Sequence, residues 1–195
     1  MSDPRRPVPP VPIAERVRAL EEALSAKQVV PDGFLDAAAA QAEREWSPRN
    51  GAQVVARAWV DPAYRARLLA DGAAAAAELG FNATNNEYLV VLENTPTLHN
   101  VIVCTQCSCT AWSVIGLPPD WYKSPEYRAR VVREPRTLLR EMGLDVPEDV
   151  AIRVWDTSGE TRYMVLPLRP PGTEGWSEER LAAIVTREAL IGVAR

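Results

Sequence analysis

The chain has 195 residues, of which 47% are hydrophobic and 25% are charged, and its formal net charge is −4 at pH 7. A chain of this length and composition can bury a sizeable core, and its slight acidity excludes the basic surface that nucleic-acid-binding proteins present. No run approaches the ~18 consecutive apolar residues of a membrane helix, so no membrane partner is expected either.

The chain begins with a Pro-rich tail, MSDPRRPVPPVP. This tail lacks the apolar segment of a secretory signal peptide, so we expect an extended tail and a cytoplasmic protein. Apolar residues then recur at helical spacing at Ile13, Val17, Leu20 and Leu24. An Ala-rich segment that begins at Asp32 again places apolar residues on one helical face. These stripes indicate packing surface, either for the chain's own core or for a partner.

A further helix is predicted from Asp61, because Asp is a good N-cap and the following Pro62 suits the first helical position. Gly80 supplies the glycine that commonly ends such a helix. We therefore divide the chain at this point. Residues 1–80 form the tail and a helical N-terminal arm, and residues 81–195 form an α/β domain that carries the cysteines.

Strands are predicted from Tyr88 onward. The runs YLVVL and NVIV are rich in β-branched and aliphatic residues, and the ENTP between them supplies turn residues. The segments AIRVWD and TRYMVLP, joined by TSGE, are typical of a hairpin. Ser124 and Ser177 each open a helix, the second of which should be the last of the chain. Strands interleaved with helices predict an α/β sandwich rather than a helical bundle.

All three cysteines of the chain lie within the run VCTQCSC, at Cys104, Cys107 and Cys109. A single cluster is no disulfide framework, so it indicates a metal or redox site. Cys107 and Cys109 enclose the backbone nitrogens of Ser108 and Cys109, so two sulfurs and two amides could chelate a metal in a plane, with the Cys104 sulfur below. Such donors suit late transition metals and favour low-spin Co(III) or Fe(III) with one open position, which acts as a Lewis acid.

Other interpretations of the cysteines stay open at this point. Free cysteines are among the most buried residue types, so all three could be small core side chains. His99, the only histidine, or a partner chain could complete a zinc knuckle. An iron–sulfur cluster normally takes four thiolates, and a Cys–His hydrolase would need His99 and Cys104 to meet from within one strand-like segment. We expect His99 to be structural.

The cysteine run resembles the motif VC(T/S)LCSC of nitrile hydratase α subunits. The similarity continues after the motif in TAWSVIGLPPDWYKSPEYRARVVREPR, and before it in NGAQVVARAWVDPAYRARLLADG, ELGF and LVVLENTPTLHNVIV. With the segment from IRVWDTSGETRYMVLP to the C-terminal region, the resemblance covers residues 48–195. The cysteine motif together with WYKS and REPR makes it specific.

This resemblance implies an α+β fold, a four-layered α-β-β-α metal-binding domain with a helical N-terminal arm. It implies that Cys104 is the axial thiolate, that Cys107 is oxidised to cysteine sulfinic acid and that Cys109 is oxidised to cysteine sulfenic acid. Ser108 and Cys109 match the positions whose amide nitrogens bind the metal. Cys109 is then the catalytic residue, with its sulfenate oxygen or a metal-bound hydroxide as the nucleophile.

The implied activity is that of a lyase, the hydration of a nitrile to the corresponding amide at one Co(III) or Fe(III) ion per α subunit. The implied partners are a β subunit, whole or split, whose arginines hydrogen-bond the oxidised sulfurs, and a metallochaperone or activator. The metal subunit of thiocyanate hydrolase is similar, so that activity is an alternative. A metal-holding assembly subunit without activity of its own is another.

Four further positions bear on the metal and on the substrate pocket. Gln106 stands where the family carries Leu, so its polar side chain should meet solvent, the partner or the substrate channel. Asn85 stands where iron-type members carry Gln, and its shorter side chain would enlarge the pocket. Thr105 resembles the cobalt-type motif whereas CSCTAW resembles iron-type members, and we favour cobalt. Trp112 either packs beneath the cysteines or lines the pocket.

A basic stretch surrounds one of the predicted helices, with Arg128, Arg130, Arg133 and Arg136. Such a stretch is usually a solvated or salt-bridged helix face. An interface with an acidic partner surface is the alternative.

Overall fold

The computed structural model describes residues 11–31, 33–82 and 88–195. Contacts divide the chain into two compact units, residues 1–43 and residues 44–195. The helices of residues 48–78 therefore group with the strands, whereas the sequence-based division lies at residue 80. The sequence-based division marks where strands begin in the sequence. As a boundary between an arm and a metal-binding domain it stays a prediction.

The described part of the first unit is helical. It contains α1 (Ile13–Ala26) and most of α2 (Phe34–Glu45), where the apolar spacing predicts helices, although Asp32 lies outside the described residues. Neither helix has a buried residue. Their apolar side chains face solvent instead, with Ile13 75% and Leu20 60% exposed. Among the described residues of this unit, the apolar stripe is therefore exposed.

Three helices come next: α3 (Pro48–Val60), α4 (Pro62–Ala70) and α5 (Gly72–Glu78). Each begins at a side chain that accepts hydrogen bonds from first-turn amides, namely Ser47, Asp61 and Asp71. The predicted start at Asp61 is confirmed. The single Ala-rich helix expected from there to Gly80 is instead two helices, because Asp71 caps a new start.

The described strands form two parallel pairs. The strands are β1 (Tyr88–Glu93), β2 (Leu98–Val103), β3 (Ala151–Asp156) and β4 (Thr161–Leu166). β1 pairs with β4 from Tyr88↔Thr161 to Glu93↔Leu166, and β2 pairs with β3 from Leu98↔Ala151 to Val103↔Asp156. Parallel pairing brings the carboxyl ends of β2 and β3 to one edge.

The predicted hairpin of β3 and β4 is wrong. Its turn does form, since the Ser158 hydroxyl accepts hydrogen bonds from the amides of Glu160 and Thr161. The turn, however, carries the chain from one strand pair to the other. β4 contacts β2 as well as β1 and buries Met164, Val165 and Leu166. Burial against distant strands, which local turn chemistry cannot reveal, selects the pairing.

Short helices complete the second unit: α6 (Trp112–Ile115), α7 (Asp120–Lys123), α8 (Pro125–Arg133), α9 (Pro135–Glu141), α10 (Glu178–Ala182) and α11 (Arg187–Ile191). Ser124 and Ser177 cap α8 and α10 as predicted. The helix at Ser177 is not the last, because Thr186 caps α11 after it.

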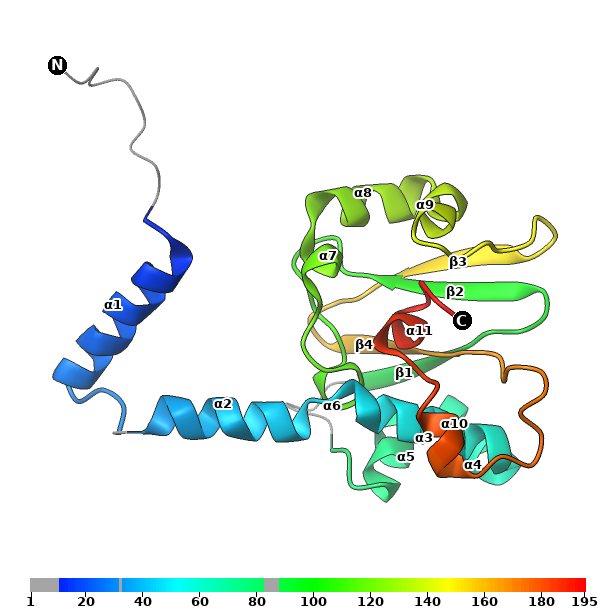
Figure 1. The fold of residues 1–195 in the computed structure, drawn as a ribbon, viewed down its shortest axis with the longest axis horizontal. Helices are drawn as coiled ribbons and strands as arrows, with labels where there is room; N and C mark the ends of the chain where they lie inside the picture. Colours follow the sequence, from blue (N-terminus) through cyan, green and yellow to red (C-terminus); the bar gives the residue numbers. More distant parts are fainter. Residues whose placement is uncertain (1–10, 32, 83–87) are drawn as a thin grey trace, which may run out of the picture. The chain divides into compact units, whose positions relative to one another are not determined.

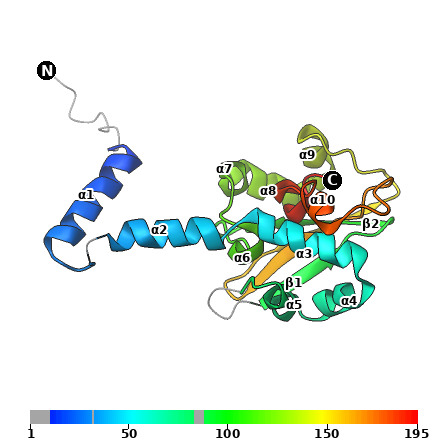
Figure 2. The same cartoon turned by 60° about the horizontal axis from the view of Figure 1, so that its bottom comes forward.

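Within residues 44–195, helices lie on both outer sides of the two strand pairs (Figure 1). α4 and α5 contact β1, α9 contacts β3, and β2 contacts β4. In Figure 2, α3 lies between α6 and α4 on the β1 side, and α3 contacts both of these helices. α11 packs against β2 and β4 with Leu190 and Ile191 fully buried. The result is a mixed helix and sheet unit with its core around the strands.

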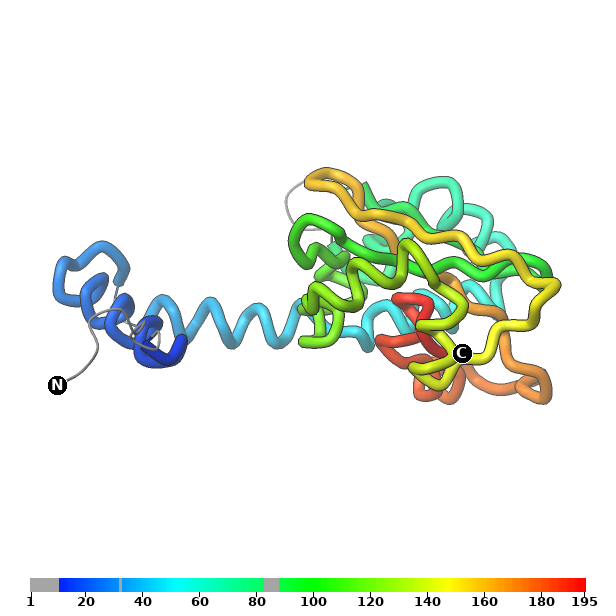
Figure 3. Tube along the Cα trace, turned by 90° about the horizontal axis from the view of Figure 1, so that it is seen from above, coloured from blue at the N-terminus to red at the C-terminus, as the bar shows by residue number. Residues whose placement is uncertain are grey.

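The C-terminus lies beside the segment that follows α9 (Figure 3), where the Arg195 guanidinium donates to the Asp145 carbonyl at 3.3 Å. The C-terminal segment is thereby tied to the side of the unit that carries α8 and α9.

Candidate metal centre

The three cysteines lie in the segment that leaves the carboxyl end of β2, here called the cysteine loop (residues 104–109). Cys104 directly follows β2 and is 1% exposed, Cys109 is half-buried, and Cys107 is exposed. All three thiols are free. A rigid strand thus anchors one sulfur in the core while the loop brings the other two toward solvent.

The three sulfurs lie within 4.8 Å of one another. The Cys104 and Cys107 sulfurs are 3.4 Å apart, and the Cys107 and Cys109 sulfurs are 3.0 Å apart. With metal–sulfur bonds of about 2.3 Å, sulfurs at right angles around one ion would be roughly 3.3 Å apart. The loop therefore fits a single metal ion held by three sulfurs.

Hydrogen bonding and burial separate the acidities of the two outer thiols. Hydrogen bonds with the Cys109 and Cys104 sulfurs and the amides of Ser108 and Cys109 lower the pKa of Cys107 to about 7. Burial, followed by the hydrogen bond with Cys107, raises the pKa of Cys109 to about 11, and the nearby Arg162 guanidinium opposes this rise. Cys107 therefore loses its proton first, and thiolate is the form that binds metals.

Side chains from other elements hold the cysteine loop in shape through hydrogen bonds. Asp156, the last residue of β3, accepts a hydrogen bond from the Thr105 amide at 2.9 Å and one from its hydroxyl at 2.5 Å. The Tyr122 hydroxyl of α7 donates to the Cys109 carbonyl at 3.2 Å. Burial raises the pKa of Tyr122 well above its usual value, so this hydroxyl keeps its proton and remains a donor.

One arginine of the basic stretch reaches the cysteine loop. Arg128 of α8 donates from Nη1 to the carbonyls of Gln106 and Cys107, at 3.3 and 3.2 Å. Arg130 instead forms ion pairs with Glu126, Glu134 and Glu141, as expected for a salt-bridged face. Arg136 donates to the carbonyls of Val146, Pro147 and Val150.

Asp156, Tyr122 and Arg128 were not predicted as part of the site. They lie between 13 and 51 positions from the loop residues they contact, so only tertiary structure brings them there. The basic stretch did not distinguish Arg128 from its neighbours, and the segments that carry the resemblance at Tyr122 and Asp156 did not reveal that these two side chains contact the cysteine loop.

Two of the three predicted pocket residues lie in the described part of the structure. Gln106 is exposed, as its polar side chain predicts. Trp112 is half-buried and packs against Trp46, with ring centroids 4.5 Å apart. Asn85 lies outside the described residues. The pocket assignments of these residues stay predictions.

His99 is held away from the cysteines, which argues against a zinc site completed by its ring. Its Nε2 donates to the Gly192 carbonyl at 2.7 Å, and Nδ1 accepts from the side-chain amide of Asn94 at 3.2 Å. Burial lowers the pKa of His99, so the neutral ring is favoured. Nε2 joins β2 to Gly192, just after α11, and Nδ1 joins it to Asn94, just after β1, so both ring nitrogens have a structural role.

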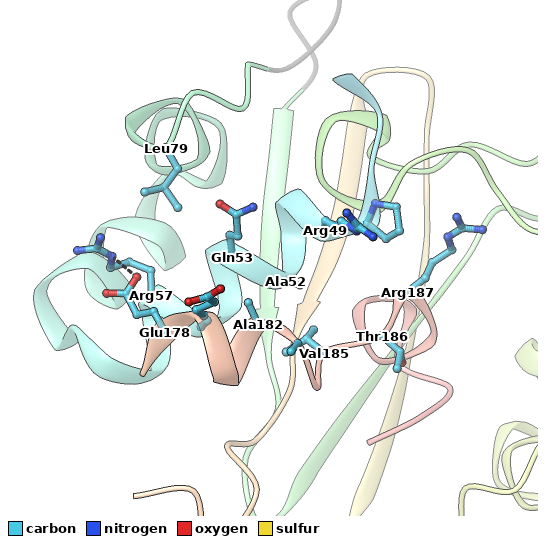
Figure 4. Close-up of a pocket in the computed structure, with 14 residues that line it drawn as sticks. Arg49, Ala52, Gln53, Arg57, Leu79, Glu178, Ala182, Val185, Thr186 and Arg187 are labelled. Carbon is cyan, nitrogen blue, oxygen red and sulfur yellow. Dashed lines mark ion pairs between the residues drawn. The ribbon is translucent and has the colours of Figure 1, made fainter. Parts of the chain in front are cut away.

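A groove of about 940 Å³ lies between α3 and α10 with the start of α11, and none of the cysteines lines it. Figure 4 shows Gln53 and Arg57 of α3 facing this groove, and the ion pair of Arg57 with Glu178 at 3.0 Å crosses one end. Because no cysteine sulfur lines this groove, its size alone does not make it the reaction site.

No helix among the described residues is long and apolar enough to cross a membrane.

Comparison with known proteins identifies close relatives. The family model described as "Nitrile hydratase, alpha chain" matches residues 11–194. The α subunit of a low-molecular-weight cobalt-containing nitrile hydratase from Rhodococcus rhodochrous is 52% identical over 182 residues, 93% of this chain and 88% of the relative. Thiocyanate hydrolase subunit γ from Thiobacillus thioparus is 48% identical over 158 residues, 75% of this chain and 65% of the relative.

A solved structure has the same fold. The structure is a double mutant of the Fe-type nitrile hydratase from Comamonas testosteroni Ni1, and the TM-score is 0.90. It is 53% identical, with 94% of this chain and 89% of the other chain covered. Relatives named for either metal are therefore about equally similar in sequence.

Proposed function

The chain belongs to the nitrile hydratase α-chain family, and on that premise we propose that its cysteine loop is the metal centre at which a nitrile is hydrated to an amide. The observation that carries the proposal is the gathering of three free cysteine sulfurs within 4.8 Å at the carboxyl end of β2. Cys104, Cys107 and Cys109 would hold the ion through sulfur, and Ser108 and Cys109 through their backbone nitrogens.

The metal we propose is one cobalt(III) ion per chain, with iron(III) as the alternative. A trivalent ion in this site would supply Lewis acidity toward the nitrile. Support for cobalt comes from Thr105, which resembles the cobalt-type motif, and from the relative named as cobalt-containing. The Fe-type neighbour keeps iron as the alternative.

The chain's own residues would have two roles around this ion, reaction with the nitrile and positioning of the loop. Cys107 and Cys109 would carry added oxygens, as sulfinic and sulfenic acid, and the Cys109 oxygen would face the nitrile carbon as the nucleophile. Tyr122 and Asp156 hold the loop at its two ends through the Cys109 carbonyl and the Thr105 amide. Such fixed backbone contacts keep the sulfurs in place without reorganisation during the reaction.

We propose that the β subunit, whole or split, covers the exposed side of the cysteine loop. Cys107, Thr105 and Gln106 are exposed in this chain, and a shallow hollow lined by Thr105 and Arg128 lies beside them. Arginines of the β subunit would hydrogen-bond the oxidised sulfurs there, as the family resemblance implies. A metallochaperone would load the ion. Asn85, Gln106 and Trp112 are proposed to line the pocket for a small nitrile.

The four-layered α-β-β-α arrangement is also a proposal. Its support is that α4 and α5 contact β1, α9 contacts β3, and β2 contacts β4 between them. A cytoplasmic location stays a prediction, consistent with three reduced thiols.

The proposal is tested by co-expression with the β subunit in medium that supplies either cobalt or iron. Elemental analysis of the purified complex should give one metal ion per α chain, and peptide masses should show added oxygens on Cys107 and Cys109. Nitrile hydration should require the metal. A fully active complex whose cysteines are unoxidised would show that the oxidation proposal is wrong.

Hydrolysis of thiocyanate is the second candidate function, favoured by the 48% identity to the thiocyanate hydrolase subunit. The same complex should be assayed with thiocyanate beside nitriles. Activity with thiocyanate alone would reassign the substrate. Metal binding without turnover of either substrate would instead indicate an assembly subunit.

A further inference from the structure

Arg128 differs from the other arginines of α8 in where its guanidinium lies. Its Nη1 donates to two successive carbonyls of the cysteine loop, those of Gln106 and Cys107. Its Nε is buried and makes no hydrogen bond among the described residues. Arg133 lies further along the same helix and is exposed. The hydrogen bond that it donates among the described residues stays within α8, to the Ala129 carbonyl at 3.2 Å. Arg128 is thus enclosed against the loop instead of being solvated.

The two contacts constrain the direction of the loop's amide groups. A trans peptide is planar, so its N–H points opposite to its carbonyl. When the Gln106 and Cys107 carbonyls point at Arg128, the amides of Cys107 and Ser108 must point to the other side. That side carries the sulfurs, since the Cys107 amide donates to the Cys104 sulfur at 3.3 Å.

The positive charge of Arg128 lies beside the Cys107 carbonyl oxygen. The Cys107 carbonyl and the Ser108 nitrogen belong to one peptide group, and resonance shares charge between them. A nitrogen that binds a metal as an anion therefore places negative charge on that carbonyl oxygen, 3.2 Å from Nη1. Arginine stays protonated in proteins, so this positive charge is permanent.

We propose that Arg128 is a positioning residue that turns the Cys107 and Ser108 amides toward the sulfurs and offsets the charge of the metal-bound backbone. The inference rests on the proposed metal centre. It places part of the support for that centre inside this chain, on α8, independent of any arginine that a partner supplies. Removing the guanidinium should loosen the loop and weaken metal retention while the fold persists.

The test compares Arg128→Gln and Arg128→Lys with the unchanged chain and with Arg133→Gln as the matched control on the same helix. Each full-length chain is co-expressed with the β subunit and cobalt, and the rate of cobalt loss to a chelator is measured on the purified complex. Loss of a partner that orients a ligand typically costs about 10- to 100-fold in metal affinity, so Arg128→Gln should lose cobalt at least about tenfold faster. The rate of cobalt loss from Arg128→Lys should lie between those of the unchanged chain and Arg128→Gln, because an ammonium keeps the charge but not the planar fork.

Amide hydrogen exchange on the metal-free isolated chains supplies a second measurement that does not depend on activity. The Cys107 and Ser108 amides should exchange faster in Arg128→Gln, with no change in the core strands or in Arg133→Gln. Equal cobalt loss and equal exchange in Arg128→Gln and the unchanged chain would overturn the proposal. If Arg128→Gln does not fold, Arg128→Lys decides by the same measurements.

These experiments distinguish a failure of the proposed function from a failure of the proposed role of Arg128. If the unchanged complex retains cobalt but hydrates no nitrile, the proposed function fails while the cobalt-loss comparison still tests Arg128. If the unchanged complex is active and Arg128→Gln matches it in retention and exchange, Arg128 has no positioning role and the function stands.

Discussion

Helices α1 and α3 are both amphipathic, yet they use their apolar faces in opposite ways. α3 buries six residues, including Val54 and Val55, against the rest of residues 44–195. α1 buries none, and its Ile13, Val17 and Leu20 are exposed. The same sequence pattern thus builds the core in one region and leaves an unoccupied surface in the other. The comparison teaches that periodicity predicts a helix but not what covers it.

This difference predicts that the two regions respond differently to mutation. Changes in residues 44–195 should affect metal binding and folding of the chain itself. Changes in α1 should affect association with other chains, because a solvent-exposed apolar stripe contributes little to the stability of an isolated chain.

The largest effect is expected from the cysteine loop. Replacement of Cys104, Cys107 or Cys109 by Ser should abolish metal retention and activity, because each change removes one of the three sulfurs that lie within 4.8 Å. Circular dichroism should show a retained fold, most safely for the exposed Cys107. Elemental analysis of the complex measures the effect. Stoichiometric metal with full activity in any of the three would contradict the assigned ligands.

The next effect concerns the close approach of α3 to α6. A Cβ on Gly51 would collide with the Val114 carbonyl and the Leu190 side chain. Alanine gains about 1 kcal/mol over glycine inside a helix, but overpacking a core costs about 1–3 kcal/mol, and a backbone carbonyl cannot move aside cheaply. Because the Val114 carbonyl puts the overpacking cost toward its upper end, we expect Gly51→Ala to lower the free energy of unfolding by up to about 2 kcal/mol.

Denaturant titration measures this change. Gly159→Ala is the control, since a Cβ there meets nothing within 4 Å. An unchanged or raised unfolding midpoint in Gly51→Ala would show that the helices separate without cost.

A smaller effect on stability is expected from α1. Leu20→Glu should leave the unfolding midpoint of the isolated chain nearly unchanged, because Leu20 is 60% exposed. It should reduce both self-association of the isolated chain and its assembly with the β subunit, since the apolar stripe of α1 would carry a charge. Sedimentation with and without the β subunit measures this. A variant that loses stability but not association would reverse the assignment of this helix.

The smallest effect is the pH dependence that His99 contributes. Burial lowers the pKa of His99 from its usual 6.5 in the folded chain. The unfolded chain therefore binds a proton more readily, so the stability contributed by the neutral ring is present above pH 6.5 and is lost as the pH falls below it. His99→Gln should flatten the dependence of unfolding free energy on pH just below 6.5. An unchanged slope would assign the dependence to other groups.

Local chemistry decided what could be predicted from the sequence. Asp61 and Ser124 start helices because their side chains accept hydrogen bonds from amides two or three residues ahead, and the sequence alone reveals such partners. The cysteine loop could be recognised for the same reason, since Cys104, Cys107 and Cys109 bring their sulfurs together by spacing along a short segment.

Only the tertiary structure decided which strands pair and what surrounds the sulfurs. The turn at Ser158 was foreseen, but β3 and β4 leave it for different partners because burial against β2 and β1 outweighs their proximity in sequence. Arg128, Tyr122 and Asp156 meet the loop through contacts that span 13 to 51 residues. A sequence pattern records the distance between residues along the chain, whereas these contacts depend on how strands and helices pack across the core.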